Sequence, residues 1–130
     1  MDNDRHRSNE IPVNVTLESD LEPVVFCAGS FFSEPNGFTL RFSFGEGTYT
    51  FTRRGGVSVF SSSGILNYTV DLSHRSEVEI NSAFGLMKLV SEPKLDEVTE
   101  YDGGVKINLE YELSGGGDVQ RRKLKIDARY

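Results

Sequence analysis

Apolar and polar side chains alternate without a break in VKINLEYEL, residues 105–113. The odd-numbered positions carry Val, Ile, Leu, Tyr and Leu, whereas the even-numbered positions carry Lys, Asn and Glu. A second stretch, FTLRFSF at residues 38–44, alternates in the same way, with phenylalanine or leucine at every even position. Because successive side chains of a β-strand point to opposite faces, both stretches are predicted to be strands with one dry and one wet face.

Turn residues divide the rest of the chain into similar short runs, among them residues 65–73, 86–91 and 95–101. The runs number about ten, at the spacing typical of all-β folds. The connections are too short for crossover helices, so the sheet is predicted to be antiparallel. Without helices, a sheet hides its dry face and its edges best by closing on itself. We therefore predict an all-β fold, a single antiparallel β-barrel of about eight to ten strands.

The parity of the dry residues sets the register of the last hairpin. Dry positions are odd in residues 105–113 and even in the final strand. A two-residue turn at residues 115–116 would oppose Leu113 to Asp118, a poor match. A four-residue loop at residues 115–118 instead opposes apolar residues inside and opposite charges outside, namely Leu109 to Leu124, Ile107 to Ile126, Glu112 to Arg121 and Glu110 to Lys123. The longer loop is therefore predicted.

The composition indicates one ordinary globular domain. The chain has 130 residues, 37% of them hydrophobic and 26% charged, which suffices for a single core. Residues 1–10 are polar or charged apart from Met1. We expect them to form a flexible tail, followed by one barrel domain over residues 11–130.

The net charge and the cysteine content limit which binding partners and which cellular compartment are expected. The net charge of −6 argues against a nucleic-acid partner. No stretch approaches the roughly 20 apolar residues of a membrane-spanning helix, and the N-terminus lacks the apolar core of a secretory signal. The single cysteine, Cys27, cannot form an intramolecular disulfide. A cytoplasmic protein without a membrane partner is predicted, and the sequence carries no prediction of oligomeric state.

Three segments carry a resemblance to a known family. The segment SAFG at residues 82–85 enters the strand LMKL, residues 86–89, and the long strand at residues 105–113 follows after a linker. The run at residues 24–32 has Gly29 before its aromatic residues. In these features, and in length and strand order from Val13 to the C-terminus, the chain resembles the YwiB-like family of uncharacterised bacterial proteins. The resemblance implies a calycin-like, that is lipocalin-like, β-barrel, and it implies no activity and no catalytic residues.

Motifs for catalysis are missing from the sequence. It contains no Cys-x-x-Cys, no glycine-rich phosphate loop before a helix, no His-Glu-x-x-His and no strand-turn-helix context for a nucleophilic serine. The acidic stretch at residues 96–102 lacks the calcium-loop pattern of an EF-hand. We therefore expect a non-enzymatic protein without a cofactor and without a metal ion.

Four residues are candidates for ligand binding: Arg122, Tyr111, His74 and Tyr68. Extending the alternation of Tyr68 and Val70 by two steps beyond Leu72 would point His74 inward, whereas a strand that ends at Ser73 leaves it in a wet turn. Arg122 falls on the inward parity of the last strand, opposite Tyr111. A guanidinium beside a tyrosine hydroxyl can hold a carboxylate or phosphate, whereas an arginine near the hairpin end can instead extend to solvent along its aliphatic stem.

The sequence is compatible with two functions. A barrel of this size leaves room for one small apolar or amphipathic ligand, which favours a binding module. The alternative is a packed barrel that serves as a structural or protein-interaction module, because the predicted inward residues are bulky. The inward residues meant here are Phe38, Leu40, Phe42, Phe44, Tyr49, Phe51, Leu109 and Tyr111.

Overall fold

The computed structural model describes residues 10–20 and 23–130, and these contain ten β-strands. No helix occurs in this part of the chain, and so none that is long and apolar enough to cross a membrane. The strands are β1 (Glu10–Ser19), β2 (Val25–Glu34), β3 (Gly37–Phe44), β4 (Gly47–Arg54), β5 (Val57–Ser63), β6 (Tyr68–Asp71), β7 (Ser76–Ser82), β8 (Gly85–Tyr101), β9 (Gly104–Gly115) and β10 (Asp118–Arg129). The predicted tail lies outside the described residues except for Glu10, which begins β1.

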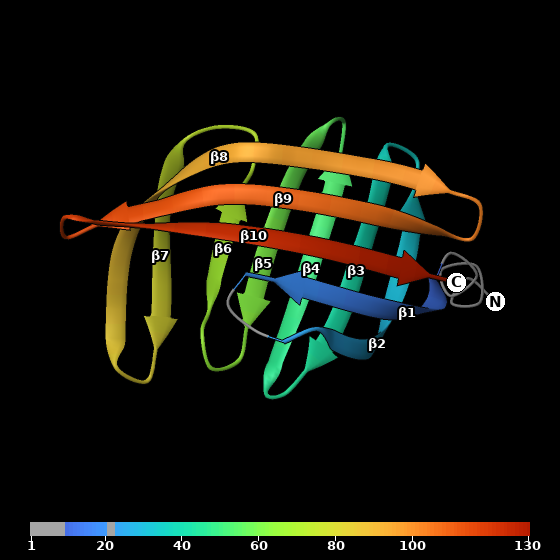
Figure 1. Ribbon diagram of the computed structural model, residues 1–130, viewed down its shortest axis with the longest axis horizontal. Coiled ribbons are helices and arrows are strands. Elements are labelled where there is room, and N and C mark those ends of the chain that lie inside the picture. Colours follow the sequence, from blue (N-terminus) through green and yellow to red (C-terminus); the bar gives the residue numbers. More distant parts are fainter. Residues whose placement is uncertain (1–9, 21–22) are drawn as a thin grey trace.

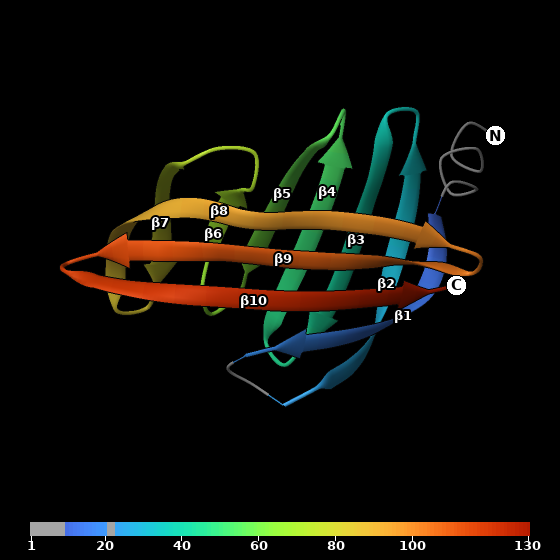
Figure 2. The same ribbon diagram turned by 45° about the horizontal axis from the view of Figure 1, so that its top comes forward.

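All ten strands form one antiparallel sheet in the order β6-β5-β4-β3-β2-β1-β10-β9-β8-β7. Its two end strands approach each other, and backbone hydrogen bonds of 2.9 and 3.0 Å join Asn67 and Asn81 beside them. The sheet is thus nearly closed into a barrel. The strands β8, β9, β10 and β1 cross in front of the strands from β2 to β7 (Figures 1 and 2). The prediction of an all-β antiparallel barrel is confirmed.

Gly29 is the residue at which β2 begins to pair with β3 as well as with β1. The strand pairs with β1 from Val25 to Phe32, but with β3 only from Gly29 onward. A β-carbon at Gly29 would lie 2.6 Å from the carbonyl oxygen of Arg41 and 3.1 Å from the Val15 side chain. Only glycine permits this close approach of two neighbouring strands.

The dry faces deduced from alternation form the core. In β3, Phe38, Leu40 and Phe42 are buried, and the predicted dry residues of β9 are all buried as well. Arg41 is exposed as expected. Thr39 differs, because it is 7% exposed although it lies on the outer face. Side chains from the ends of β2 and β4 cover it there.

The register of the last hairpin matches the prediction. β10 and β9 oppose Leu109 to Leu124, and ion pairs join Arg121 to Glu112 at 3.1 Å and Lys123 to Glu110 at 3.3 Å. The ladder continues to Gly115 and Asp118, so the turn itself contains only Gly116 and Gly117. Both glycines have positive φ, 60° and 89°, which suits a tight hairpin turn.

Strand boundaries differ from the expectation in two places. Residues 86–91 and 95–101 belong to one strand, β8, because the ladder with β9 continues through a bulge between Pro93 and Leu95. Proline cannot donate a ladder hydrogen bond, and a bulge accommodates it without ending the strand. The run at residues 65–73 contracts to β6, which spans four residues.

At the barrel end formed by the carboxyl end of β4, an ion pair crosses the interior. Arg53 on β4 donates to Ser58 at 2.9 Å and to Asp96 on β8 at 3.2 Å. The side chains of Arg53 and Asp96 are 30% and 18% exposed. Strands β4 and β8 are not neighbours in the sheet, so this pair joins opposite walls.

Alanine substitutions are expected to distinguish the buried face of the sheet from the exposed face by their effect on stability. Phe42→Ala and Leu109→Ala should each lower the free energy of unfolding by about 2 to 5 kcal/mol, because both side chains are fully buried. Arg41→Ala should cost only about 0.5 kcal/mol, since it loses an exposed contact with the Phe32 ring. Urea unfolding of the three variants measures these changes, and equal costs at residues 41 and 42 would contradict the face assignment.

Candidate functional site

A cavity of about 360 Å³ occupies the opposite end of the barrel, where the β3–β4 and β5–β6 connections lie. Its volume is at the lower end of the roughly 300–1,000 Å³ of small-molecule sites. Five aromatic side chains line it: Phe44, Tyr49, Phe60, Tyr68 and Tyr111. Aliphatic residues complete the wall, and its charged residues are Asp20, Glu46 and Arg122. We call this space the end cavity.

Strand register brings the polar groups of the end cavity together. Arg122 on β10 lies opposite Tyr111 on β9, and Tyr68 on β6 lies opposite Ser62 on β5. The β6–β5 pair and the β10–β9 pair belong to distant parts of the sheet, and closure of the barrel makes them face each other. Three of the four sequence candidates, Arg122, Tyr111 and Tyr68, thus line one cavity.

The tyrosine hydroxyls form a hydrogen-bonded chain within the end cavity. Tyr111 is hydrogen-bonded to Tyr68, and Tyr68 to Ser62, whose hydroxyl also donates to the carbonyl oxygen of Leu66 at 3.1 Å. Burial is the main cause that raises the pKa of Tyr68, and it raises the pKa of Tyr111 far above the usual range. Both phenols are therefore neutral at pH 7.

Arg122 is the cation of the end cavity. Its guanidinium donates to the side-chain oxygen of Gln120 at 3.3 Å. Among residues 10–20 and 23–130, no carboxylate forms an ion pair with it, whereas its neighbours Arg121 and Lys123 both pair with glutamates on the outer face. Its positive charge opposes the rise of both tyrosine pKa values.

Aromatic rings form one wall of the end cavity. The ring of Tyr49 stacks on Phe44 at a centroid distance of 4.8 Å and an interplanar angle of 16°. It is also nearly parallel to Phe60, at 6.1 Å and 15°. Neighbouring strands β3, β4 and β5 supply these three rings, which therefore share one orientation.

His74 does not line the end cavity. It lies in the connection after β6 and its side chain is 64% exposed. Its Nδ1 is 3.0 Å from the Ser73 hydroxyl and 3.7 Å from Asp71. The Ser73 hydroxyl donates directly to Asp71 at 2.5 Å, so the serine is not activated by the histidine. His74 therefore lies in a polar turn, which is the second of the two positions that the sequence left open.

Sequence reasoning missed part of the wall. Phe44 and Tyr49 were expected inside the barrel but not as part of a binding site, and Phe60 and Ser62 were not singled out. In VSVFSSS, residues 57–63, the buried positions are Ser58, Phe60 and Ser62. Two of these three are serine, so polarity conceals the alternation that would have placed Phe60 inside.

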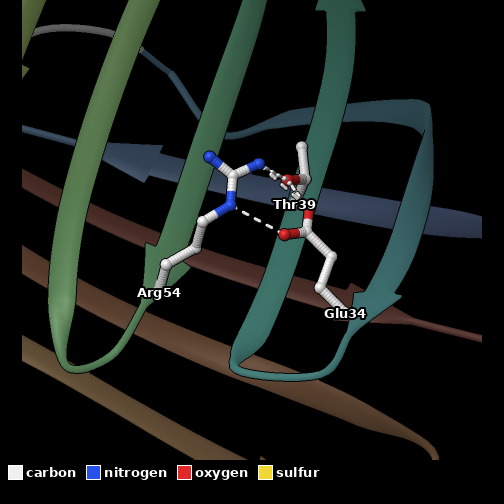
Figure 3. Close-up of polar contacts among 3 residues, drawn as sticks. All are labelled: Glu34, Thr39 and Arg54. Carbon is white, nitrogen blue, oxygen red and sulfur yellow. Dashed lines mark hydrogen bonds and ion pairs between the residues drawn. The ribbon is translucent and has the colours of Figure 1, made fainter.

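A second polar cluster lies on the outer face at the opposite end of the barrel (Figure 3). Arg54 donates to both oxygens of Glu34, at 2.7 and 3.1 Å, and Thr39 donates to the same carboxylate at 2.6 Å. In register, Gly37 of β3 lies opposite both Glu34 and Arg54, so the two side chains meet across β3. The Arg54 hydrogen bond, followed by that of Thr39, lowers the pKa of Glu34 to about 2.

This cluster stabilises the barrel rather than presenting a free charge, because its carboxylate is already fully engaged. The lowered pKa makes the stabilisation depend on pH. The contribution of Glu34 is complete above its ordinary pKa of 4.5 and is lost as pH falls toward about 2.

Glu34→Gln is therefore expected to lower the thermal midpoint at pH 7, because glutamine cannot pair with Arg54 as an anion. The difference in thermal midpoint between the variant and the unmodified protein should shrink as pH falls from 4.5 to about 2, where Glu34 becomes protonated. Thermal unfolding across this range tests the expectation. Glu97→Gln, at an exposed position of β8, is the control and should change little. A difference in thermal midpoint that stays the same across this pH range would contradict the lowered pKa of Glu34.

Comparison with known proteins supports the fold. The sequence matches no protein-family model and no curated protein. Among solved structures, the crystal structure of the ywiB protein from Bacillus subtilis superimposes with a TM-score of 0.72. The two chains are 14% identical, and the match covers 93% of this chain and 92% of that chain. The expected YwiB-like fold is thereby confirmed: this chain is a β-barrel with the same fold as the ywiB protein.

Proposed function

We propose that this protein binds a small amphipathic anion in the end cavity and catalyses no reaction on it. The observation that carries the proposal is the position of Arg122, whose guanidinium shares the cavity with two neutral tyrosine hydroxyls and an apolar wall. Such a cavity offers a polar seat for a head group and a dry surface for the rest of the ligand. Family membership and a calycin-like relationship are part of the same proposal, supported by the shared fold.

A carboxylate is the head group that these donors favour. A guanidinium offers parallel N–H donors that match a carboxylate. Anionic phenols would repel such a head group, but burial keeps Tyr68 and Tyr111 protonated. A hydrogen bond to a charged group is worth about 1.5 to 3 kcal/mol, so loss of Arg122 should weaken binding by roughly tenfold or more.

The packing in the middle of the barrel is relevant to the alternative function, a packed structural or interaction module. Leu40, Phe42 and Phe51 are at most 1% exposed, so the middle of the barrel is filled. The end cavity leaves space for a ligand at one end of the barrel. A packed structural or interaction module would tolerate loss of the Arg122 charge, whereas a binding module would not.

Arg122→Leu is expected to weaken anion binding while the barrel stays folded, because leucine keeps part of the apolar stem and removes the charge. The purified protein would be titrated with two fluorescent amphipathic anions, anilinonaphthalene sulfonate and a dansyl-labelled fatty acid. The matched control is Arg121→Leu, which removes a neighbouring arginine from the outer face. Thermal unfolding of each variant verifies the fold.

The proposal requires that at least one probe binds the unmodified protein and the Arg121 variant alike, with affinity reduced roughly tenfold or more in the Arg122 variant. Absence of binding for both probes, or equal binding by the two variants, would show that the barrel is a packed module.

A further inference from the structure

We infer that the end cavity selects a flat aromatic carboxylate over an alkyl carboxylate of the same size. The inference rests on the proposed function and names its ligand class. Three features of the cavity support it: its limited depth, the parallel rings of one wall, and the position of the cation.

The depth of the end cavity excludes an extended chain. Phe42, Ile107 and Leu109 of the barrel interior are at most 1% exposed, so the space around them is filled. At the other end, the Arg53–Asp96 ion pair crosses the interior. An alkyl tail anchored by its carboxylate at Arg122 would have to fold within about 360 Å³ or leave through the mouth. A tail folded inside the cavity loses conformational entropy, and a tail that leaves through the mouth loses apolar contact.

The wall of the end cavity matches a rigid ring. Phe44, Tyr49 and Phe60 are nearly parallel, with interplanar angles of 16° and 15° between neighbours. Aromatic rings prefer offset stacked or edge-on contacts with other rings, worth about 0.5 to 1.5 kcal/mol beyond the area they bury. A planar ligand can extend this set of rings without an entropy cost from its own rotatable bonds.

The position of the cation fixes how such a ligand would lie. Arg122 and Leu124 share the inward face of β10, and Leu17 of β1 lies beside them in the same cavity. These residues face the aromatic wall across the barrel, because β10 and β4 are four positions apart in the sheet. A carboxylate at Arg122 therefore leaves an attached ring between aliphatic side chains on one side and aromatic rings on the other.

The closing experiment compares naphthoate with undecanoate, two carboxylates with the same number of carbon atoms. Isothermal titration calorimetry measures both on the full chain, and naphthoate fluorescence gives a second readout because the protein contains no tryptophan. We expect naphthoate to bind at least about tenfold more tightly, which corresponds to 1.4 kcal/mol. Arg122→Leu should weaken both ligands.

A substitution in the wall tests the selectivity itself. Phe44→Leu should weaken naphthoate several-fold and leave undecanoate nearly unchanged, because leucine keeps an apolar wall and removes the ring. Phe44 is only partly buried at the end of β3, which favours a folded variant, and thermal unfolding confirms it. The control is Phe84→Leu, the same substitution at a fully exposed ring on the β7–β8 turn.

The outcomes separate this inference from the proposed function. Undecanoate binding as tightly as naphthoate, or a Phe44→Leu variant that weakens both equally, would overturn the inference and leave an anion-binding cavity. If neither carboxylate binds, or if loss of the Arg122 charge has no effect on either, the proposed function itself is wrong.

Discussion

The sheet has to cover its own apolar face, because the described residues contain no helix to do so. Closure into a barrel is the physical solution, and each strand then needs strict alternation of apolar and polar residues. One consequence appears at Gly29, where β1, β2 and β3 crowd together and no side chain fits.

Closure also decides where inward polar residues can lie. In the middle of the barrel, inward positions are filled by side chains such as Leu40 and Phe51, and an unpaired charge there would be costly. Toward the ends, water reaches the interior and longer polar side chains fit. Arg53 follows this rule, since it lies next to the end of β4 on an inward-facing position.

Much of this architecture could be predicted from local pattern, because alternation and turn chemistry are local properties. The β9–β10 register is a good example, since parity and charge pairing agree along the whole hairpin. Contacts across the barrel were beyond such reasoning. Nothing in the sequence joins Tyr68 to Tyr111, or Arg53 to Asp96, because those pairs depend on how the closed sheet brings distant strands together. The burial of Thr39 depends likewise on Glu34 and Arg54, which reach it from two neighbouring strands.

The two inward arginines have different partners at the two ends of the barrel. Arg53 reaches Asp96 on the opposite wall. Arg122 has no carboxylate partner across the barrel in the part of the chain that the structure describes, and tyrosine hydroxyls face it instead. Neutral hydroxyls satisfy hydrogen bonds without neutralising the charge. The end cavity therefore sets Arg122 beside an apolar wall, with Asp20 and Glu46 also in its lining, and the proposed anion would pair with Arg122 as Asp96 pairs with Arg53.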